Sequence, residues 1–371
     1  MEKIENIDGS YAIWHESNGQ KYLEIYAFSY YDLGFLEGKF LSNKIRVLKE
    51  LIEVLALKYI AKRHTYQKFI IMAQEYEEFI PKYLQQEMQG MADALENISY
   101  EDILLQNCFL DILYGQLIPG DNYDLALHSY DFGCTSFGVI NQDSTLTGQN
   151  FDLAVMFKPT LTFTLIKMPN KPDIFSLRAG ALLSLPVGRN SYGVALNVTV
   201  IKNRMKGAIS IPCSIKARIA FETCNTAETL YNFIIKTPSP TSGTLLIADE
   251  SKIIGLEILP SKYKREDVSN TIVRSNTYIS NSLQKYLIKQ KYSKKRQKYA
   301  EEQLNEVYNN NKGLTDDGLL NLLADDPIIC RMKYRRARTI AFNTKLYFGL
   351  GNPNQNKPGI IPLKQINEPL K

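Results

Sequence analysis

Gly133 and Cys134 are the pair in this sequence with the clearest chemical potential. They lie in the stretch 131-DFGCTSFGVI-140, where small hydroxyl residues and then β-prone residues follow the cysteine. Glycine tolerates strained backbone conformations and leaves its carbonyl unhindered. Attack by the Cys134 thiol on the Gly133 carbonyl would give a thioester that water opens. The residues alone leave open the alternative that Cys134 is a buried, inert cysteine after a turn.

A nucleophilic thiol needs a base that accepts its proton. The three histidines are His15, His64 and His128, and His128 precedes Cys134 by six residues in a loop. A histidine-assisted cysteine protease is therefore one alternative. The other base is the α-amine of Cys134 itself, which becomes free if the 133–134 bond breaks. This amine titrates at about 7.7–8.0, so it can accept the proton near neutral pH.

The composition is that of an ordinary globular chain. Its 371 residues allow one large domain or two ordinary ones, and they are 44% hydrophobic and 22% charged. The net charge of +5, from 44 basic and 39 acidic residues, is too small to indicate nucleic-acid binding. The sequence has no phosphate-loop motif, no HExxH motif and no metal-ligand cluster. We therefore expect no cofactor and no metal.

The cysteines and the apolar segments indicate a reducing compartment. The five cysteines are widely spaced and odd in number, which is not typical of a disulfide framework or a zinc site: Cys108, Cys134, Cys213, Cys224 and Cys330. The start of the sequence contains no apolar stretch of signal-peptide length, and no run approaches the roughly 20 apolar residues of a membrane span. We expect a cytoplasmic protein without membrane contact.

The hydrophobic pattern changes once along the chain. Residues 1–26 alternate as a hairpin would, and residues 32–114 have helical spacing, with Ser99 as an expected N-cap three residues before Asp102. After Gly133, short β-prone runs dominate. Further helices are expected at 214–224, 226–235 and 283–308, and two final strands at 337–353. We expect the lysines and Arg296 of the 283–308 helix to lie on a solvated face, with a basic recognition surface as the alternative.

Several motifs in a fixed order resemble those of a known enzyme family. They are GFLEG at 34–38, EMQGMADAL at 87–95, GCTSFGV at 133–139, GQNFD at 148–152, NSYGVALN at 190–197, TLLIADES at 244–251 followed by Glu257, VRSNTY at 273–278 and IICR at 328–331. Together they resemble the penicillin acyltransferase-like branch, the acyl-CoA:6-aminopenicillanate acyltransferase group, of the cysteine N-terminal nucleophile (Ntn) hydrolases. Many members continue the last motif with His, where this chain has Met332. Choloylglycine hydrolases are more distant relatives, since they usually carry an arginine where this chain has Gln149.

The resemblance implies a role for each matching residue. Cys134 is the implied nucleophile and, after cleavage at Gly133–Cys134, the new N-terminus. Asp152, at the end of the GQNFD motif, holds and orients the freed amine. Asn276 matches the asparagine that donates to the oxyanion. Asn197 is a further candidate near the site, with a structural hydrogen bond as the alternative.

Two arginines are candidates for contacting an acidic group of a substrate. They are Arg178 and Arg274, and a surface or structural role is the alternative for each of them.

The implied fold is α+β, a four-layer αββα sandwich with a helix-rich precursor segment packed on it. Residues 1–133 would be that segment, the α chain after cleavage, and residues 134–371 the β chain, in one integrated unit. The implied activity is hydrolysis of a linear amide C–N bond through a thioester acyl-enzyme. Partners are then a small amide or acyl donor and the chain's own precursor segment.

Two other functions stay open at this point. The first is transfer of the acyl group to an amine, in which a coenzyme A thioester is a possible substrate rather than a cofactor. The second is an inactive relative that acts as a binding protein.

Overall fold

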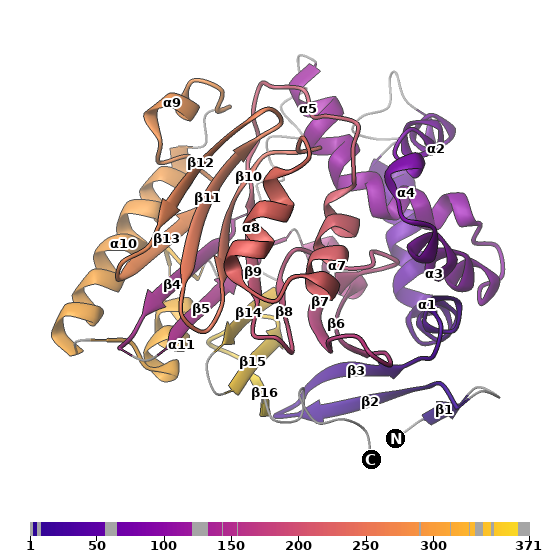
Figure 1. Cartoon of the computed structure of the whole chain (residues 1–371), viewed down its shortest axis with the longest axis horizontal. Coiled ribbons are helices and arrows are strands. Elements are labelled where there is room, and N and C mark those ends of the chain that lie inside the picture. Colours follow the sequence, from indigo (N-terminus) through magenta and orange to yellow (C-terminus); the bar gives the residue numbers. More distant parts are fainter. Residues whose placement is uncertain are drawn as a thin grey trace.

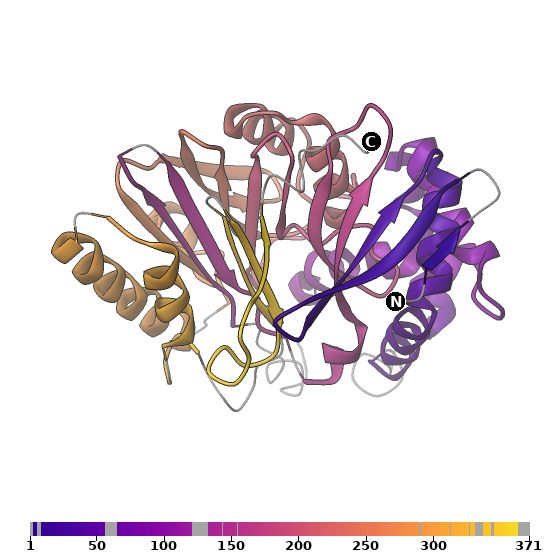
Figure 2. The same cartoon turned by 90° about the horizontal axis from the view of Figure 1, so that it is seen from below.

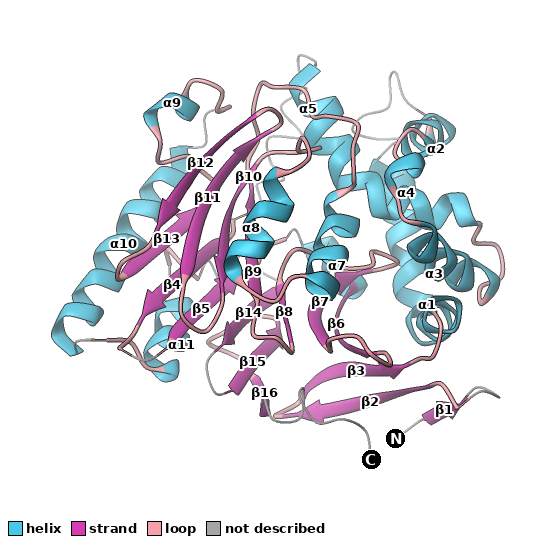
Figure 3. Cartoon of the chain, viewed as in Figure 1, coloured by secondary structure: helices cyan, strands magenta, loops and turns pink. Residues whose placement is uncertain are grey.

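Two β-sheets packed between layers of helices make up the computed structural model of the chain (Figure 1, Figure 3). The larger sheet contains the N-terminal strands, and the smaller sheet is built from strands of the middle and the end of the sequence. The structure describes residues 3–5, 9–55, 65–120, 133–142, 144–153, 155–288, 291–311, 313–325, 327–330, 337–342 and 345–362.

The larger sheet has ten strands and begins with the N-terminal hairpin. The hairpin turn consists of Asn18 and Gly19, both at positive φ, as a two-residue hairpin loop requires. Strand β3 then pairs in parallel with β6, which joins the first segment of the chain to the rest. The strand order is β1 (Lys3–Glu5), β2 (Tyr11–Ser17), β3 (Gln20–Tyr26), β6 (Leu161–Lys167), β7 (Ile174–Ala179), β8 (Gly188–Asn190), β9 (Ala195–Val200), β10 (Gly243–Ala248), β11 (Ile253–Leu259) and β12 (Lys262–Asp267).

The smaller sheet has six strands and carries the start of the predicted catalytic half. Its order is β13 (Thr271–Ser275), β4 (Thr135–Ile140), β5 (Thr145–Asn150), β14 (Ala337–Phe342), β15 (Lys345–Leu350) and β16 (Gly359–Pro362). Strands β4 and β5 contact β9 and β10 of the larger sheet, so the two sheets face each other. Figure 2 shows both sheets between their helices.

Helices cover the outer face of each sheet and complete four layers. On the smaller sheet, α10 (Lys291–Asn311) packs on β13, and α11 (Asp316–Ala324) packs on β5. On the larger sheet, α7 (Cys213–Thr223) packs on β8, and α8 (Ala227–Ile235) packs on β10 and β11. The order of layers is therefore helix, sheet, sheet, helix, which confirms the predicted αββα architecture.

The N-terminal helices form a group beside the larger sheet, on the right in Figure 1. Ser99 caps one of them, α4, through a reciprocal capping box with Asp102, as the sequence predicts. The group and the short helical elements are α1 (Tyr30–Leu55), α2 (Tyr66–Gln74), η2 (Glu77–Phe79), α3 (Lys82–Asp93), α4 (Tyr100–Asp111), the π-helical η3 (Ile112–Leu117), α5 (Ile118–Gly120), η4 (Val155–Thr160) and α9 (Asn281–Gln284).

Glycines let α1 and α3 pack with their backbones almost in contact. A Cβ atom on Gly34 would lie 1.8 Å from the Glu87 carbonyl oxygen, and one on Gly90 would lie 2.2 Å from the Tyr31 carbonyl oxygen. Any larger side chain would push the helices apart. The glycines of the GFLEG and EMQGMADAL motifs are therefore explained by helix packing.

The glutamates of the same two motifs form buried ion pairs with later parts of the chain. Glu37 of α1 makes a bidentate pair with Arg178 of β7, and neither side chain is exposed. Glu87 of α3 lies 3.1 Å from Arg218 of α7, which also binds Glu222. These pairs link the N-terminal helices to the sheet-rich part of the chain in its interior.

Most of the predicted elements are confirmed, and one is wrong. The hairpin, the helical region, the two helices that follow Pro212 and the strands at 337–353 are present. The single helix expected at 283–308 is instead divided into α9 and α10, because Leu287 forms a β-bridge with Asn203 in extended backbone. Among the described residues, no helix is long and apolar enough to cross a membrane.

We expect Arg178→Met to lower the free energy of unfolding by about 3–5 kcal/mol, because it leaves the Glu37 carboxylate buried without its partner. The control is Lys21→Met. Lys21 pairs with Glu16 at the surface, where the side chains are 65% and 57% exposed, and its loss should cost less than about 1 kcal/mol. Urea unfolding of both variants checks this. Equal costs for the two variants would contradict the role given to the buried pair.

Candidate active site

Cys134 lies immediately before β4. It lines a cavity together with Leu48 and Ile52 of the N-terminal helix α1. The pairing of β4 with β5 sets Thr135 opposite Asn150. The same register continues two residues further, where the Gly133 N–H donates to the Asp152 carbonyl at 3.4 Å. The segment from Cys134 to Asp152 is therefore one hairpin, and its ladder brings Asp152 to the predicted cleavage point.

Asn276 reaches the same place from the other neighbour of β4. It directly follows β13, which pairs with β4 so that Ser275 lies opposite Thr135. Its side-chain amide donates to the Val200 carbonyl at 2.8 Å. An amide nitrogen has two N–H donors, so one remains for an oxyanion. The structure thus brings Cys134, Asp152 and Asn276 together.

Arg296 is the residue of this site that the sequence analysis missed. Its guanidinium donates to the Asn276 side-chain oxygen at 2.7 Å and to the Cys134 carbonyl at 3.3 Å. The side chain is fully buried, so the expectation that it lies on a solvated helix face is wrong. The helical period of the sequence could have predicted this burial, because Arg296 shares one face of α10 with the buried residues Ala300 and Leu304.

The surroundings of Cys134 hold its thiol in the protonated form in the uncleaved chain. Burial raises the pKa of the Cys134 thiol to about 12, and the Asp152 carboxylate adds to the rise. The Asp152 backbone N–H, the positive charge of Arg296 and the Asn276 amide oppose this rise in pKa. Cys134 therefore already has the groups that stabilise a thiolate, but burial and the nearby carboxylate outweigh them.

Asn197 lies on the face of β9 that is turned toward the smaller sheet. Thr199, two residues further along the strand and thus on the same face, donates to the Ser275 carbonyl at 2.9 Å. Asn197 is fully buried, and neither its amide nitrogen nor its oxygen has a hydrogen-bond partner among the described residues. A structural hydrogen bond within that part of the chain therefore does not explain it, and its role as a polar group of the site stays a prediction.

The two candidate arginines are both engaged in ion pairs away from Cys134. Arg178 binds Glu37 and the Leu182 carbonyl. Arg274 binds Glu266 and its neighbour's carbonyl at Val273. These contacts favour the structural alternative for both, and a contact with an acidic substrate group stays a prediction.

The histidines do not offer a base within the described residues. His15 lies in β2, where it stacks on Tyr22 and its ring nitrogen is 3.4 Å from a carboxylate oxygen of Glu24. His64 and His128 lie outside the described residues, so the protease alternative is not tested.

Glu257 positions the chain that follows Asn276. Its carboxylate accepts the backbone N–H groups of Ile279 and Ser280. This fixes the turn after β13 and, with the bond to Val200, the orientation of Asn276.

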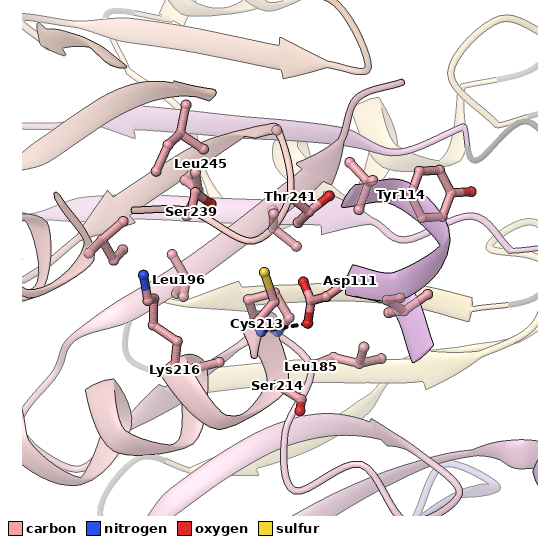
Figure 4. Close-up of a pocket in the computed structure, with 18 of the residues that line it drawn as sticks. Asp111, Tyr114, Leu185, Leu196, Cys213, Ser214, Lys216, Ser239, Thr241 and Leu245 are labelled. Carbon is pink, nitrogen blue, oxygen red and sulfur yellow. Dashed lines mark hydrogen bonds between the residues drawn. The ribbon is translucent and has the colours of Figure 1, made fainter. Parts of the chain in front are cut away.

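Two narrow apolar cavities lie next to each other at this site. The smaller, of about 40 Å³, is lined by Cys134 itself together with Leu48, Ile52, Phe109, Leu153 and other residues of α1, α4 and the β5–β6 connection. The larger, of about 80 Å³, lies between the outer face of the larger sheet and helices α4, α7 and α8 (Figure 4). The walls of both cavities suit an apolar group. Part of each wall comes from the helices that precede Cys134.

Comparison with known proteins gives a consistent set of similarities. A family model described as "Acyl-coenzyme A:6-aminopenicillanic acid acyl-transferase" matches residues 139–341, a range that includes Asp152 and Asn276 and begins after Cys134. The chain is 24% identical over 203 residues, 54% of its length, to the acyl-coenzyme A:6-aminopenicillanic-acid-acyltransferase 40 kDa form of Emericella nidulans. The match spans about half of that curated relative, 53% of its length.

A solved structure is similar at lower identity. It is a Caenorhabditis elegans N-acylethanolamine-hydrolyzing acid amidase ortholog, with 13% identity and a TM-score of 0.46, and the match covers 62% of this chain and all of that one.

We expect Arg296→Met to slow alkylation of Cys134 and to move its pH profile to higher pH, because loss of the positive charge raises the thiol pKa further. The control is Lys298→Met on the same helix. Lys298 is 80% exposed, and its loss should leave the profile unchanged. Peptide mass spectrometry after timed exposure to iodoacetamide measures the rate at Cys134. Faster labelling of Arg296→Met would show that the arginine acts by closing the site rather than by its charge.

Proposed function

The chain belongs to the acyl-coenzyme A:6-aminopenicillanic acid acyl-transferase family, and we propose that it is a self-processing cysteine hydrolase that cleaves a linear amide bond. The observation that carries this proposal is the convergence of Asp152, Asn276 and Arg296 on the buried thiol of Cys134. A buried inert cysteine would not need an acid, an amide donor and a guanidinium around it.

Self-processing begins with attack of the Cys134 sulfur on the Gly133 carbonyl carbon. The C–N bond to Cys134 breaks, a thioester between Gly133 and the sulfur forms, and the thiol proton passes to the departing nitrogen. Water then opens the thioester, which leaves a carboxylate on Gly133 and frees the thiol. The α-amine of Cys134 is now a base beside the Asp152 carboxylate.

Turnover repeats the same chemistry on an external substrate. The α-amine takes the thiol proton, and the thiolate attacks the substrate carbonyl. The second N–H of Asn276 stabilises the oxyanion, while Arg296 holds the asparagine oxygen in place. The amine product leaves with a proton, and water hydrolyses the remaining thioester. Until that hydrolysis, the acyl part stays covalently attached to Cys134. The cavity at Cys134 has apolar walls, which favours an acyl group that is itself apolar.

Transfer of the acyl group to an amine is the second candidate function. The description of the matching family favours it, and the thioester intermediate is common to both reactions. Adding a primary amine to the reaction distinguishes them. A transferase forms the new amide at the expense of the free acid, which mass spectrometry of the products measures.

We expect the purified chain to yield fragments of roughly 15 and 27 kDa, at about 114 Da per residue, and Cys134→Ala to stay intact. N-terminal sequencing of the larger fragment should begin CTSFGV. Amide hydrolysis should appear only in the cleaved protein. An intact chain under several expression conditions, or cleavage in Cys134→Ala, would remove the base on which the mechanism depends and favour a binding protein.

We expect Asp152→Asn to reduce kcat for an N-acyl anilide by about a hundredfold, since a misplaced base loses most of its contribution. The lost carboxylate also lowers the pKa of the α-amine, so the acidic limb of the pH profile moves to lower pH. Asp267→Asn is the control, because that surface carboxylate is 57% exposed. A lower kcat with an unmoved pH profile would contradict the contact between Asp152 and the amine.

A further inference from the structure

Lys216 is a buried lysine, and no contact among the described residues explains why its amine is buried. Its side chain extends from α7 into the larger cavity (Figure 4) and the residue is only 7% exposed. Its ammonium nitrogen has neither a hydrogen bond nor an ion pair within the part of the chain that the structure describes. Burial of a charged group without a partner is costly, and burial lowers the pKa of Lys216.

The described neighbours of Lys216 form no hydrogen bond with its side-chain nitrogen. Asp111 and Cys213 are the other titratable groups close to its nitrogen in the same cavity. One oxygen of the Asp111 carboxylate accepts the Cys213 backbone N–H at 2.9 Å, so Asp111 serves as a cap for the start of α7. Burial raises the pKa of Asp111 to about 6. A Cys213 thiolate and the Asp111 carboxylate would raise the pKa of Lys216, but neither makes contact with its nitrogen.

The place of Lys216 on its helix adds to the positive potential of this end of the cavity. It lies in the first turn of α7, where the helix dipole favours a negative group and a lysine is unfavourable. Asp111 already caps this end of α7 but gives the Lys216 nitrogen no hydrogen bond. The position of Lys216 therefore suits a further anion from outside the chain.

The larger cavity adjoins the one at Cys134. Both are lined by the same five residues, Leu110, Phe151, Leu182, Leu185 and Val200. Phe151 directly precedes Asp152. An apolar wall thus runs from the nucleophile to Lys216, and a chain bound along it would place its far end at the ammonium.

We propose that Lys216 binds a carboxylate at the far end of the substrate's acyl group, so that the enzyme acts on amides of ω-carboxylated acids. The proposal rests on the proposed function. The acyl part is assigned to the cavity because it remains on Cys134 during the thioester stage, whereas the amine product must leave. The hydrocarbon of the acyl chain contacts the shared wall, and the carboxylate replaces water around the Lys216 ammonium.

The test uses N-acyl-p-nitroanilides in a ladder of chain lengths, each with a methyl, a carboxylate or an ammonium at the far end. At the best length, kcat/KM of the native protein should be about tenfold to a hundredfold higher for the carboxylate than for the methyl end, as expected for a charge-assisted contact. Lys216→Met should reverse the preference between these two. It should also raise the thermal midpoint, because a nearly isosteric apolar side chain replaces the buried amine. The exposed Lys298→Met is the control and should leave the preference unchanged.

A second measurement needs no turnover. Thermal shifts with free dicarboxylic and monocarboxylic acids of equal length should favour the dicarboxylate in the native protein and not in Lys216→Met. Turnover without a carboxylate preference, or an ammonium-ended substrate as the best one, would overturn the assignment of Lys216 and leave the hydrolase standing. A Lys216-dependent dicarboxylate shift without any turnover would support the anion site and count against the proposed hydrolysis.

Discussion

The antiparallel pairing of β4 with β5 is the constraint on which the candidate site depends. Because its register places Asp152 across from Gly133, a slip by one residue would turn the carboxylate to the opposite face. The neighbouring strand β13 delivers Asn276 in the same way, and α10, which covers β13, delivers Arg296. Three groups far apart in the sequence thus meet at one thiol through ordinary sheet geometry.

The segment that precedes Cys134 is part of this architecture. Strand β3 extends the larger sheet through β6, and the buried pairs of Glu37 with Arg178 and Glu87 with Arg218 cross the proposed cleavage point. Separating the segments would expose these charges and the apolar wall that Leu48 contributes beside Cys134. A cut between Gly133 and Cys134 would therefore leave both pieces bound to each other, with the cavity intact.

Local patterns in the sequence predicted the hairpin, the helices and the capping box, because each depends on residues close in the chain. The motif order predicted Cys134, Asp152 and Asn276. Arg296 was missed because its neighbours are lysines, and charge patterning is a weaker guide than the helical period that puts Ala300 on the same buried face. The break before α10 could not be seen either, since it depends on the contact of Leu287 with Asn203, which only the folded chain supplies.

The charges around Cys134 suggest why cleavage and activity would be coupled. In the uncleaved chain burial and the Asp152 carboxylate together raise the pKa of the Cys134 thiol, while the cysteine nitrogen is a neutral amide. Cleavage turns that amide nitrogen into an amine that can carry a positive charge. An ammonium between the carboxylate and the sulfur offsets the negative potential and favours the thiolate. The same carboxylate that opposes ionisation before the cut would thus hold the base in place after it.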